Sequence, residues 1–202
     1  MRPVRALGVL LLALTASCLR RSDPVVLHVL RPLSPAREGA PAAAPALEVM
    51  PVRLPEALQR TQLVTEAGAG ALAISERHRW ANGLDRDVQR VLAENLAALL
   101  GSEAVVPFPD GERVKAAWRL ELDVQRLDGR PGGTLMLRAT WMLVPAKGGA
   151  AAVRRRVSLD EPVGGPGLES LAAAHDRILD RLSREIAATA ASWPSGPAPA
   201  AR

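Results

Sequence analysis

Histidine side chains are the residues of this 202-residue chain best suited to bind a metal ion or to move a proton near neutral pH. The three histidines, His28, His78 and His175, are far apart in the sequence and lack the spacing of metal ligands. The sequence also lacks a GxSxG nucleophile elbow and a GxxxxGK[ST] phosphate loop. We therefore expect surface or half-buried histidines rather than a metal site, and no cofactor.

A pair of acidic residues is the second candidate for chemistry. Glu121 and Asp123 are two positions apart, so in a strand they share one face, as paired catalytic carboxylates can. Their neighbours Arg119 and Lys115 favour a charged face in contact with water instead. Because the sequence offers no other catalytic constellation, we expect that the protein is not an enzyme.

Cys18 is the only cysteine of the chain, so it has no partner for an intramolecular disulfide. Arg2 and Arg5 lie near the start, and an uncharged apolar run follows over residues 6–14. This run has signal-peptide length and is too short to cross a bilayer as a helix. With the LTASC sequence that ends at Cys18, it looks like a bacterial lipoprotein signal, which is cut before a cysteine that becomes acylated. The alternative is an ordinary secretory signal followed by an incidental cysteine.

Removal of the signal, residues 1–17, leaves a mature chain with 24 basic and 21 acidic side chains, a net charge of +3. This weak positive charge of mixed sign is not typical of nucleic-acid binding. No later apolar run approaches the ~20 residues of a membrane span. We therefore expect a domain that is held to a membrane by acyl chains on Cys18.

The residues after Cys18 bear on which membrane that is. Leu19 and Arg20 follow it, and no aspartate is next to it. In enterobacterial-type sorting, an aspartate at that place resembles an inner-membrane retention signal. We therefore expect a lipid anchor on the periplasmic face of the outer membrane.

A segment rich in proline and alanine separates the N-terminus of the mature chain from the domain that follows. Residues 18–46 are expected to contain the lipidated N-terminus, a short strand over residues 25–30 and a Pro/Ala-rich linker. Residues 47–192 suit a single domain. Residues 193–202 are typical of a disordered tail.

Two amphipathic helices are predicted in that domain. The first begins at Leu84 and repeats apolar residues every three or four positions. Asn82 or Asp85 can cap its start, and Gly101 can cap its end. The second helix covers residues 168–190 and has the same periodicity.

Between the helices the apolar period changes to two. Alternation over residues 114–125 and 134–144 predicts two long strands with one wet face. A third strand is expected around residues 151–159, and a loose hairpin over residues 62–75. These elements predict an α+β fold, an antiparallel β-sheet meander with two amphipathic helices packed on one face.

One set of residues is not explained by periodicity. Its members are Leu54-Pro55, Leu58, Leu63-Val64, Arg79-Trp80-Ala81, Leu84 and Asn95-Leu96. Members of the PqiC family, the auxiliary lipoproteins of ABC-type lipid transport systems, carry a short LP element after an early strand and a WA-x-x-L element at the first helix. The chain resembles this family over roughly residues 25–190, and Gly83 stands where the family often has proline.

This resemblance implies a periplasmic accessory subunit of a transporter with an ATPase, a permease and a substrate-binding MCE-type protein. Such a complex moves phospholipid or another hydrophobic molecule between the inner and outer membranes, and the lipoprotein would dock the MCE assembly at the outer membrane. The partner-binding candidates are Leu54, Pro55, Arg79, Trp80 and Leu84. Two alternatives stay open: a structural or assembly lipoprotein that plugs or chaperones an outer-membrane protein, and association into a homo-oligomer.

Trp80 has two open roles. It can pack over the apolar stripe of the first helix, as a hydrophobic staple does. It can also line a partner surface with Arg79, since tryptophan and arginine are frequent interface anchors. We favour the core role, because a lone tryptophan beside a helix stripe is most often buried by packing.

Overall fold

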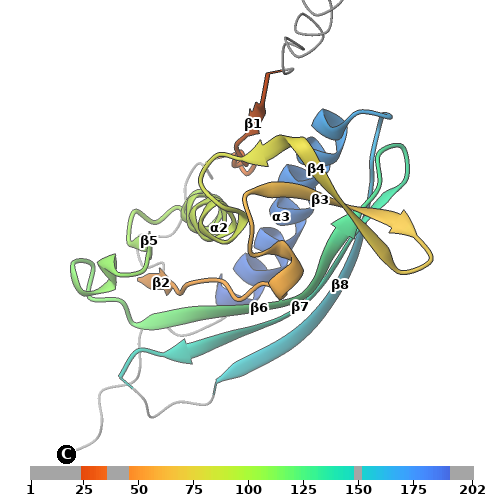
Figure 1. Cartoon of the computed structure of the whole chain (residues 1–202). Helices are drawn as coiled ribbons and strands as arrows, with labels where there is room; N and C mark the ends of the chain where they lie inside the picture. The colour runs from red at the N-terminus through yellow and green to blue at the C-terminus, as the bar shows by residue number, and fades with distance from the viewer. Residues whose placement is uncertain (1–23, 36–45, 148–151, 192–202) are drawn as a thin grey trace, which may run out of the picture.

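The computed structural model describes residues 24–35, 46–147 and 152–191, and within them the chain forms two sheets and two long helices. The elements in chain order are β1 (Val26–His28), β2 (Leu47–Val49), η1 (Glu56–Leu58), β3 (Gln62–Gly68), β4 (Ala71–Trp80), α2 (Leu84–Leu100), β5 (Val105–Pro107), η2 (Asp110–Glu112), β6 (Trp118–Gly129), β7 (Thr134–Pro145), β8 (Val153–Pro162) and α3 (Leu168–Ala191). The large sheet has the order β5-β2-β6-β7-β8, and the small sheet has the order β1-β4-β3 (Figure 1). The predicted α+β class is confirmed.

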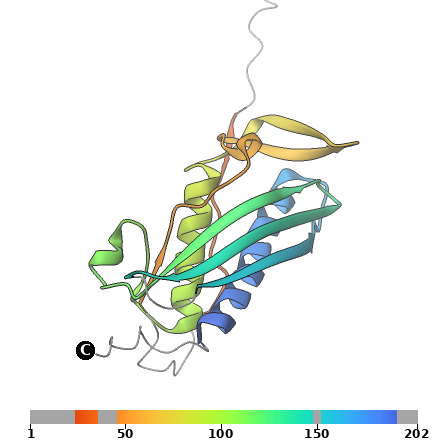
Figure 2. The ribbon, with the colours of Figure 1, turned by 90° about the horizontal axis from the view of Figure 1, so that it is seen from below.

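The antiparallel meander β6–β7–β8 forms most of the large sheet, as the alternating pattern predicts. Because successive side chains of a strand point to opposite faces, alternate apolar residues build one buried face. In register across β6 and β7, Leu122 lies opposite Trp141, and both side chains are buried. Both α2 and α3 lie on the same side of this sheet (Figure 2). The predicted arrangement of two amphipathic helices on one face is therefore confirmed.

The first strand of the meander begins later than predicted. β6 starts at Trp118 rather than at Val114, because the chain turns just before it. Lys115 has a φ of 50°, in the left-handed region, and the amide of Ala116 donates to the carbonyl oxygen of Gly111 at 2.9 Å. The apolar side chains of Val114 and Ala116 continue the alternation through this turn, so the pattern alone could not mark it.

The large sheet is extended by strands that are distant in sequence. β2 lies between β5 and β6 and is parallel to both. It ends at Val49, before Pro51, as expected for a strand that a proline interrupts. Parallel pairing of such short strands leaves no local signal, so their positions in the sheet could not be read from the sequence.

The small sheet contains the predicted hairpin, formed by β3 and β4, and its tip projects beyond the body of the molecule (Figures 1 and 2). Gly68 and Gly70 at the tip have φ values of 86° and 78°, which favour glycine. β1 pairs with the last residues of β4 in parallel. This pairing places the N-terminal strand beside Trp80.

The caps of α2 were only half predicted. Gly83, with a φ of 84°, occupies the N-cap position, and no side chain of the described residues caps this helix start. Asn82 instead donates from Nδ2 to Asp87 Oδ1 at 3.1 Å, so the prediction of an Asn82 or Asp85 cap is wrong. Gly101 ends the helix in the left-handed conformation, as predicted.

Several predicted features fall outside the described residues. These are the signal over residues 1–17, the lipidated Cys18, the tail over residues 193–202 and the linker beyond residue 35. No helix of the described ranges has the length and apolar character that crossing a bilayer requires.

Candidate functional site

The partner-binding candidates come from two places, and three of the five are buried. Leu54 and Pro55 follow the segment that Arg53 joins to β6, whereas Arg79, Trp80 and Leu84 lie at the end of β4 and the start of α2. Leu54, Trp80 and Leu84 belong to the hydrophobic core, whereas Pro55 and Arg79 are half-buried. The three core side chains therefore present little surface to another protein. Pro55 and Arg79 keep partly exposed surface, and a partner-binding role for the set stays a prediction.

Trp80 is the centre of a cluster that also contains all three histidines. The ring of His175 from α3 meets Trp80 edge-on, with centroids 5.2 Å apart, and His28 from β1 contacts Trp80 at 6.1 Å. His28 also stacks on His78 from β4, with His28 Nε2 2.9 Å from His78 Nδ1. We call these four residues the aromatic cluster. The expectation of surface or half-buried histidines is wrong for His28 and His175, which are buried, because β1 lies beside β4 and brings distant residues together.

Burial sets the charge state of the aromatic cluster. Burial lowers the pKa of His175 to about 4, and the hydrogen bond of its Nδ1 to the Leu171 carbonyl oxygen, at 2.8 Å, offsets only part of this effect. That carbonyl can only accept, so Nδ1 carries the hydrogen. Burial also lowers the pKa of His28, and the neighbouring His78 lowers it further. His28 and His175 therefore pack as neutral rings near pH 7. Among the described residues, no group of three or more His, Cys, Asp or Glu side chains has an arrangement that could hold a metal ion.

Residues 30–34, which we call the N-terminal strap, are held by buried polar side chains of both helices. The amide of Arg31 donates to Asp176 Oδ1 at 2.9 Å. The amides of Leu33 and Ser34 donate to Asn95 Oδ1 at 3.1 and 3.2 Å. Asp87 and Asp180 also accept hydrogen bonds from the strap, Arg90 donates to the Leu30 carbonyl oxygen, and Arg31 Nε donates to Asp176 Oδ2. The strap is thereby fixed to both α2 and α3.

Sequence reasoning missed these strap partners, although a signal was present. Asn95 is buried in α2 at the helical spacing of the apolar residues Val91 and Leu92. Asp176 is likewise buried on the inner side of α3. A buried polar residue needs a hydrogen-bonding partner, so each of these positions indicates that another segment lies against the helix.

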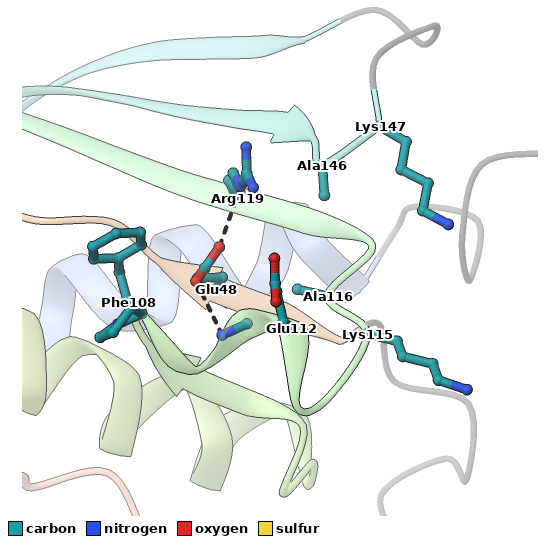
Figure 3. Close-up of a pocket in the computed structure, with 10 residues that line it drawn as sticks. Glu48, Phe108, Glu112, Lys115, Ala116, Arg119, Ala146 and Lys147 are labelled. Carbon is teal, nitrogen blue, oxygen red and sulfur yellow. Dashed lines mark hydrogen bonds and ion pairs between the residues drawn. The ribbon is translucent and has the colours of Figure 1, made fainter.

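A pocket of about 590 Å³ lies beside β2 and the loop after β5 (Figure 3). Its walls are formed by Glu48, Phe108, Pro109, Gly111, Glu112, Lys115, Ala116, Arg119, Ala146 and Lys147. Glu48 is buried, and its carboxylate accepts hydrogen bonds from the amide of Gly111 at 3.0 Å and from Arg119 Nε at 3.2 Å. Glu48 therefore connects the loop after β5 to β6. The exposed Phe108 ring and the side chains of Lys115 and Lys147 could contact an amphipathic or anionic group.

The acidic pair considered for catalysis lies near the middle of β6. Glu121 and Asp123 are half-buried and share a face of the strand. Of their expected basic neighbours, Lys115 lies in the turn before β6, and Arg119 pairs with Glu48. Arg119 therefore shares the face of β6 with the acidic pair while its side chain bonds to Glu48, and Lys115 lies outside the strand.

Comparison with family models matches residues 28–187 to the ABC-type transport auxiliary lipoprotein component family. The chain belongs to this family. The match to the auxiliary lipoproteins takes in the strap, both helices and nearly all of both sheets. It confirms the resemblance that rested on the Leu54-Pro55 and Trp80-Ala81 elements. A member of this family is a lipoprotein associated with an ABC-type transport system.

Solved structures resemble the auxiliary lipoprotein in fold. A crystal structure described only as an uncharacterized protein is 19% identical, with a TM-score of 0.65, and the match covers 83% of this chain and 99% of that one. A Xanthomonas campestris protein of the DUF330 family is 13% identical, with a TM-score of 0.67, over 81% of this chain and 93% of that one. No curated relative matches the chain. At these identities the likeness shows the fold alone.

Proposed function

We propose that this auxiliary lipoprotein is the periplasmic accessory subunit of an MCE-type ABC transport system. The complex would move phospholipid or another hydrophobic molecule between the inner and outer membranes, and the lipoprotein would dock the MCE assembly at the outer membrane. The observation that carries this proposal is the family match over residues 28–187, which takes in nearly all of the described fold. The role is one of binding, without an enzymatic step of its own.

The lipid anchor in this proposal is Cys18. Mass spectrometry of the mature protein is expected to show an acylated Cys18 as the first residue. An unlipidated N-terminus at any other residue would refute the anchor. For the outer-membrane assignment, wild type and Leu19→Asp should fractionate into different membranes, and co-fractionation of the two would contradict it.

A pull-down of the acylated protein from membranes tests the partner. We expect recovery of an MCE-domain protein together with its permease and ATPase, and loss of that recovery in a Cys18→Ser control that stays unanchored. Recovery of an outer-membrane protein without any MCE protein would instead favour the alternative, a lipoprotein that plugs or chaperones that protein.

Substitutions at Trp80 and Arg79 distinguish a role in packing from a role in partner binding. Trp80 is buried in the aromatic cluster, so Trp80→Leu is expected to lower the melting temperature. Arg79→Ala should leave the melting temperature nearly unchanged, because exchanges at partly exposed positions usually change stability by less than ~0.5 kcal/mol. Affinity for the MCE protein is measured on the same two variants. Reduced affinity of Trp80→Leu with unchanged melting would overturn the core role of Trp80.

A further inference from the structure

Exposed apolar side chains are concentrated in one short segment of the molecule. Of the eight large hydrophobic residues that are exposed within the described ranges, five lie between residues 25 and 33. The other three are Leu72, Ile74 and Phe108. Scattered exposed apolar residues are ordinary on a protein surface, but a cluster of them marks an interaction site.

Strand geometry places three of these residues on one face. His28 and Leu30 are buried, whereas Val25, Leu27 and Val29 at the alternate positions are exposed; Val26, the first residue of β1, is exposed as well, at 39%. The exposed fractions of Val25, Leu27 and Val29 are 50%, 62% and 49%. We call these three residues the docking strip. All three side chains of the docking strip are apolar and exposed to solvent. We therefore expect another surface to cover the strip.

The distance along the chain to Cys18 limits what can cover the docking strip. Six residues lie between the acylation site and Val25, which makes seven steps along the chain, and an extended chain spans at most about 3.5 Å per step. The strip therefore lies within roughly 25 Å of the lipid headgroups once Cys18 is acylated. Tethering at this range gives a second, weak membrane contact a high effective concentration.

Basic residues accompany the docking strip. Arg20 and Arg21 lie between Cys18 and the strip in the sequence. Arg79 of β4 is in register with Leu27, and its Nε is buried with no hydrogen-bond partner among the described residues. Apolar side chains flanked by arginine suit the interface of a bilayer that contains anionic lipid.

We infer that the docking strip lies against the surface of the bilayer into which Cys18 is anchored. This inference rests on the acylation of Cys18 that the proposed function includes. The domain then contacts the membrane at two points, the acyl chains on Cys18 and the docking strip, which gives it a fixed orientation on the membrane. β1 then faces the lipid, with the buried aromatic cluster behind it.

The test uses the acylated protein in vesicles of phosphatidylethanolamine and phosphatidylglycerol. Because Cys18 is the only native cysteine and its thiol is consumed by acylation, Leu27→Cys provides a unique site for an environment-sensitive fluorophore. Phe108→Cys is the matched control, since Phe108 is an apolar residue that is also exposed, at 45%, and it lines the pocket beside Glu48 rather than the docking strip. Lipids with a nitroxide near the headgroup quench a fluorophore that enters the interface.

We expect quenching of the label at position 27 to exceed that at position 108 by about twofold or more, as for a side chain inserted at the acyl boundary. Equal quenching at both positions, in protein that floats with the vesicles, overturns the docking while Cys18 anchoring stands. Failure to float with the vesicles overturns both. A blue shift at position 27 that appears without vesicles and grows with protein concentration shows that a second copy covers the strip, which also overturns the inference.

Discussion

The two sheets of this lipoprotein are held to the helices by different kinds of contact. In the large sheet, β6 and β7 pair over long stretches and turn a continuous apolar face toward α2 and α3, with Trp141 fully buried. In the small sheet, β1 makes a short pairing with β4 and is attached through the aromatic cluster and the polar bonds of the strap. The outward face of its N-terminal segment is apolar.

This difference indicates which part of the fold responds to its surroundings. Apolar burial depends little on pH or salt, so the large sheet should keep its packing across a wide range of conditions. The attachment of the small sheet to α3 depends on the neutral rings of His28 and His175 and on hydrogen bonds to carboxylates, and these change with pH. The part of the chain nearest to Cys18 is thus also the more sensitive part.

The largest expected effect is that of Trp141→Ala in the large sheet. Removing a fully buried tryptophan leaves a cavity, and the free energy of unfolding should fall by ~3–5 kcal/mol. Chemical denaturation monitored by circular dichroism measures this change. Arg154→Ala on the exposed side of β8 is the control and should stay within about 0.5 kcal/mol of wild type. A similar loss in both variants would mean that the large sheet is not held by its apolar face.

The second effect is a dependence of stability on pH that arises at the small sheet. Burial lowers the pKa of His175 to about 4 from an ordinary value of 6.5, so the unfolded chain takes up the proton first as the pH falls. The contribution of His175 is complete above pH 6.5, and up to ~3 kcal/mol is lost between pH 6.5 and pH 4. Unfolding free energies across this range measure the loss.

His175→Gln is the control for that loss, because glutamine does not titrate. The curve of stability against pH should be flatter for this variant than for wild type, and parallel curves would contradict the assignment. Burial raises the pKa of Asp176, which acts with the opposite sign, since the folded state then takes up the proton first. This effect and that of His28 are present in both proteins, so the difference between the curves reports on His175.

The smallest of the three effects concerns the strap. Asn95→Ala removes the acceptor for the amides of Leu33 and Ser34 and is expected to cost ~1–3 kcal/mol. Asn82→Ala is the matched control, because Asn82 is exposed and its side chain bonds only to Asp87 among the described residues. Hydrogen exchange at Leu33 and Ser34 should quicken in the first variant only. Unchanged exchange would show that Asn95 does not hold the strap.

Sequence periodicity predicted the large sheet and the helices well, because their signals are local. Alternate residues of β7 such as Leu135 and Leu137 are buried as predicted, and Gly101 ends α2 in the left-handed conformation. The same periodicity failed at residues 114–117, where a turn happens to carry alternating apolar side chains. Periodicity reports which face is apolar, and it does not report where a strand stops.

The aromatic cluster could not be predicted, because its members come from three distant elements. His28, Trp80 and His175 meet only once β1 lies parallel to β4 over α3. No spacing in the sequence encodes that parallel pairing. The LP and WA-x-x-L elements did point to the family, and they gave no sign that Trp80 packs against a histidine of the last helix.

The strap determines how the molecule carries mechanical load. A pull on the membrane tether enters the domain through β1. The residue pairs between β1 and β4 follow one another along the strand, so they are loaded together in shear. Beyond β1, the tension passes at Arg31 to Asp176 of α3 and at Leu33 to Asn95 of α2. The two helices therefore take the force together, and the meander behind them stays outside the load path.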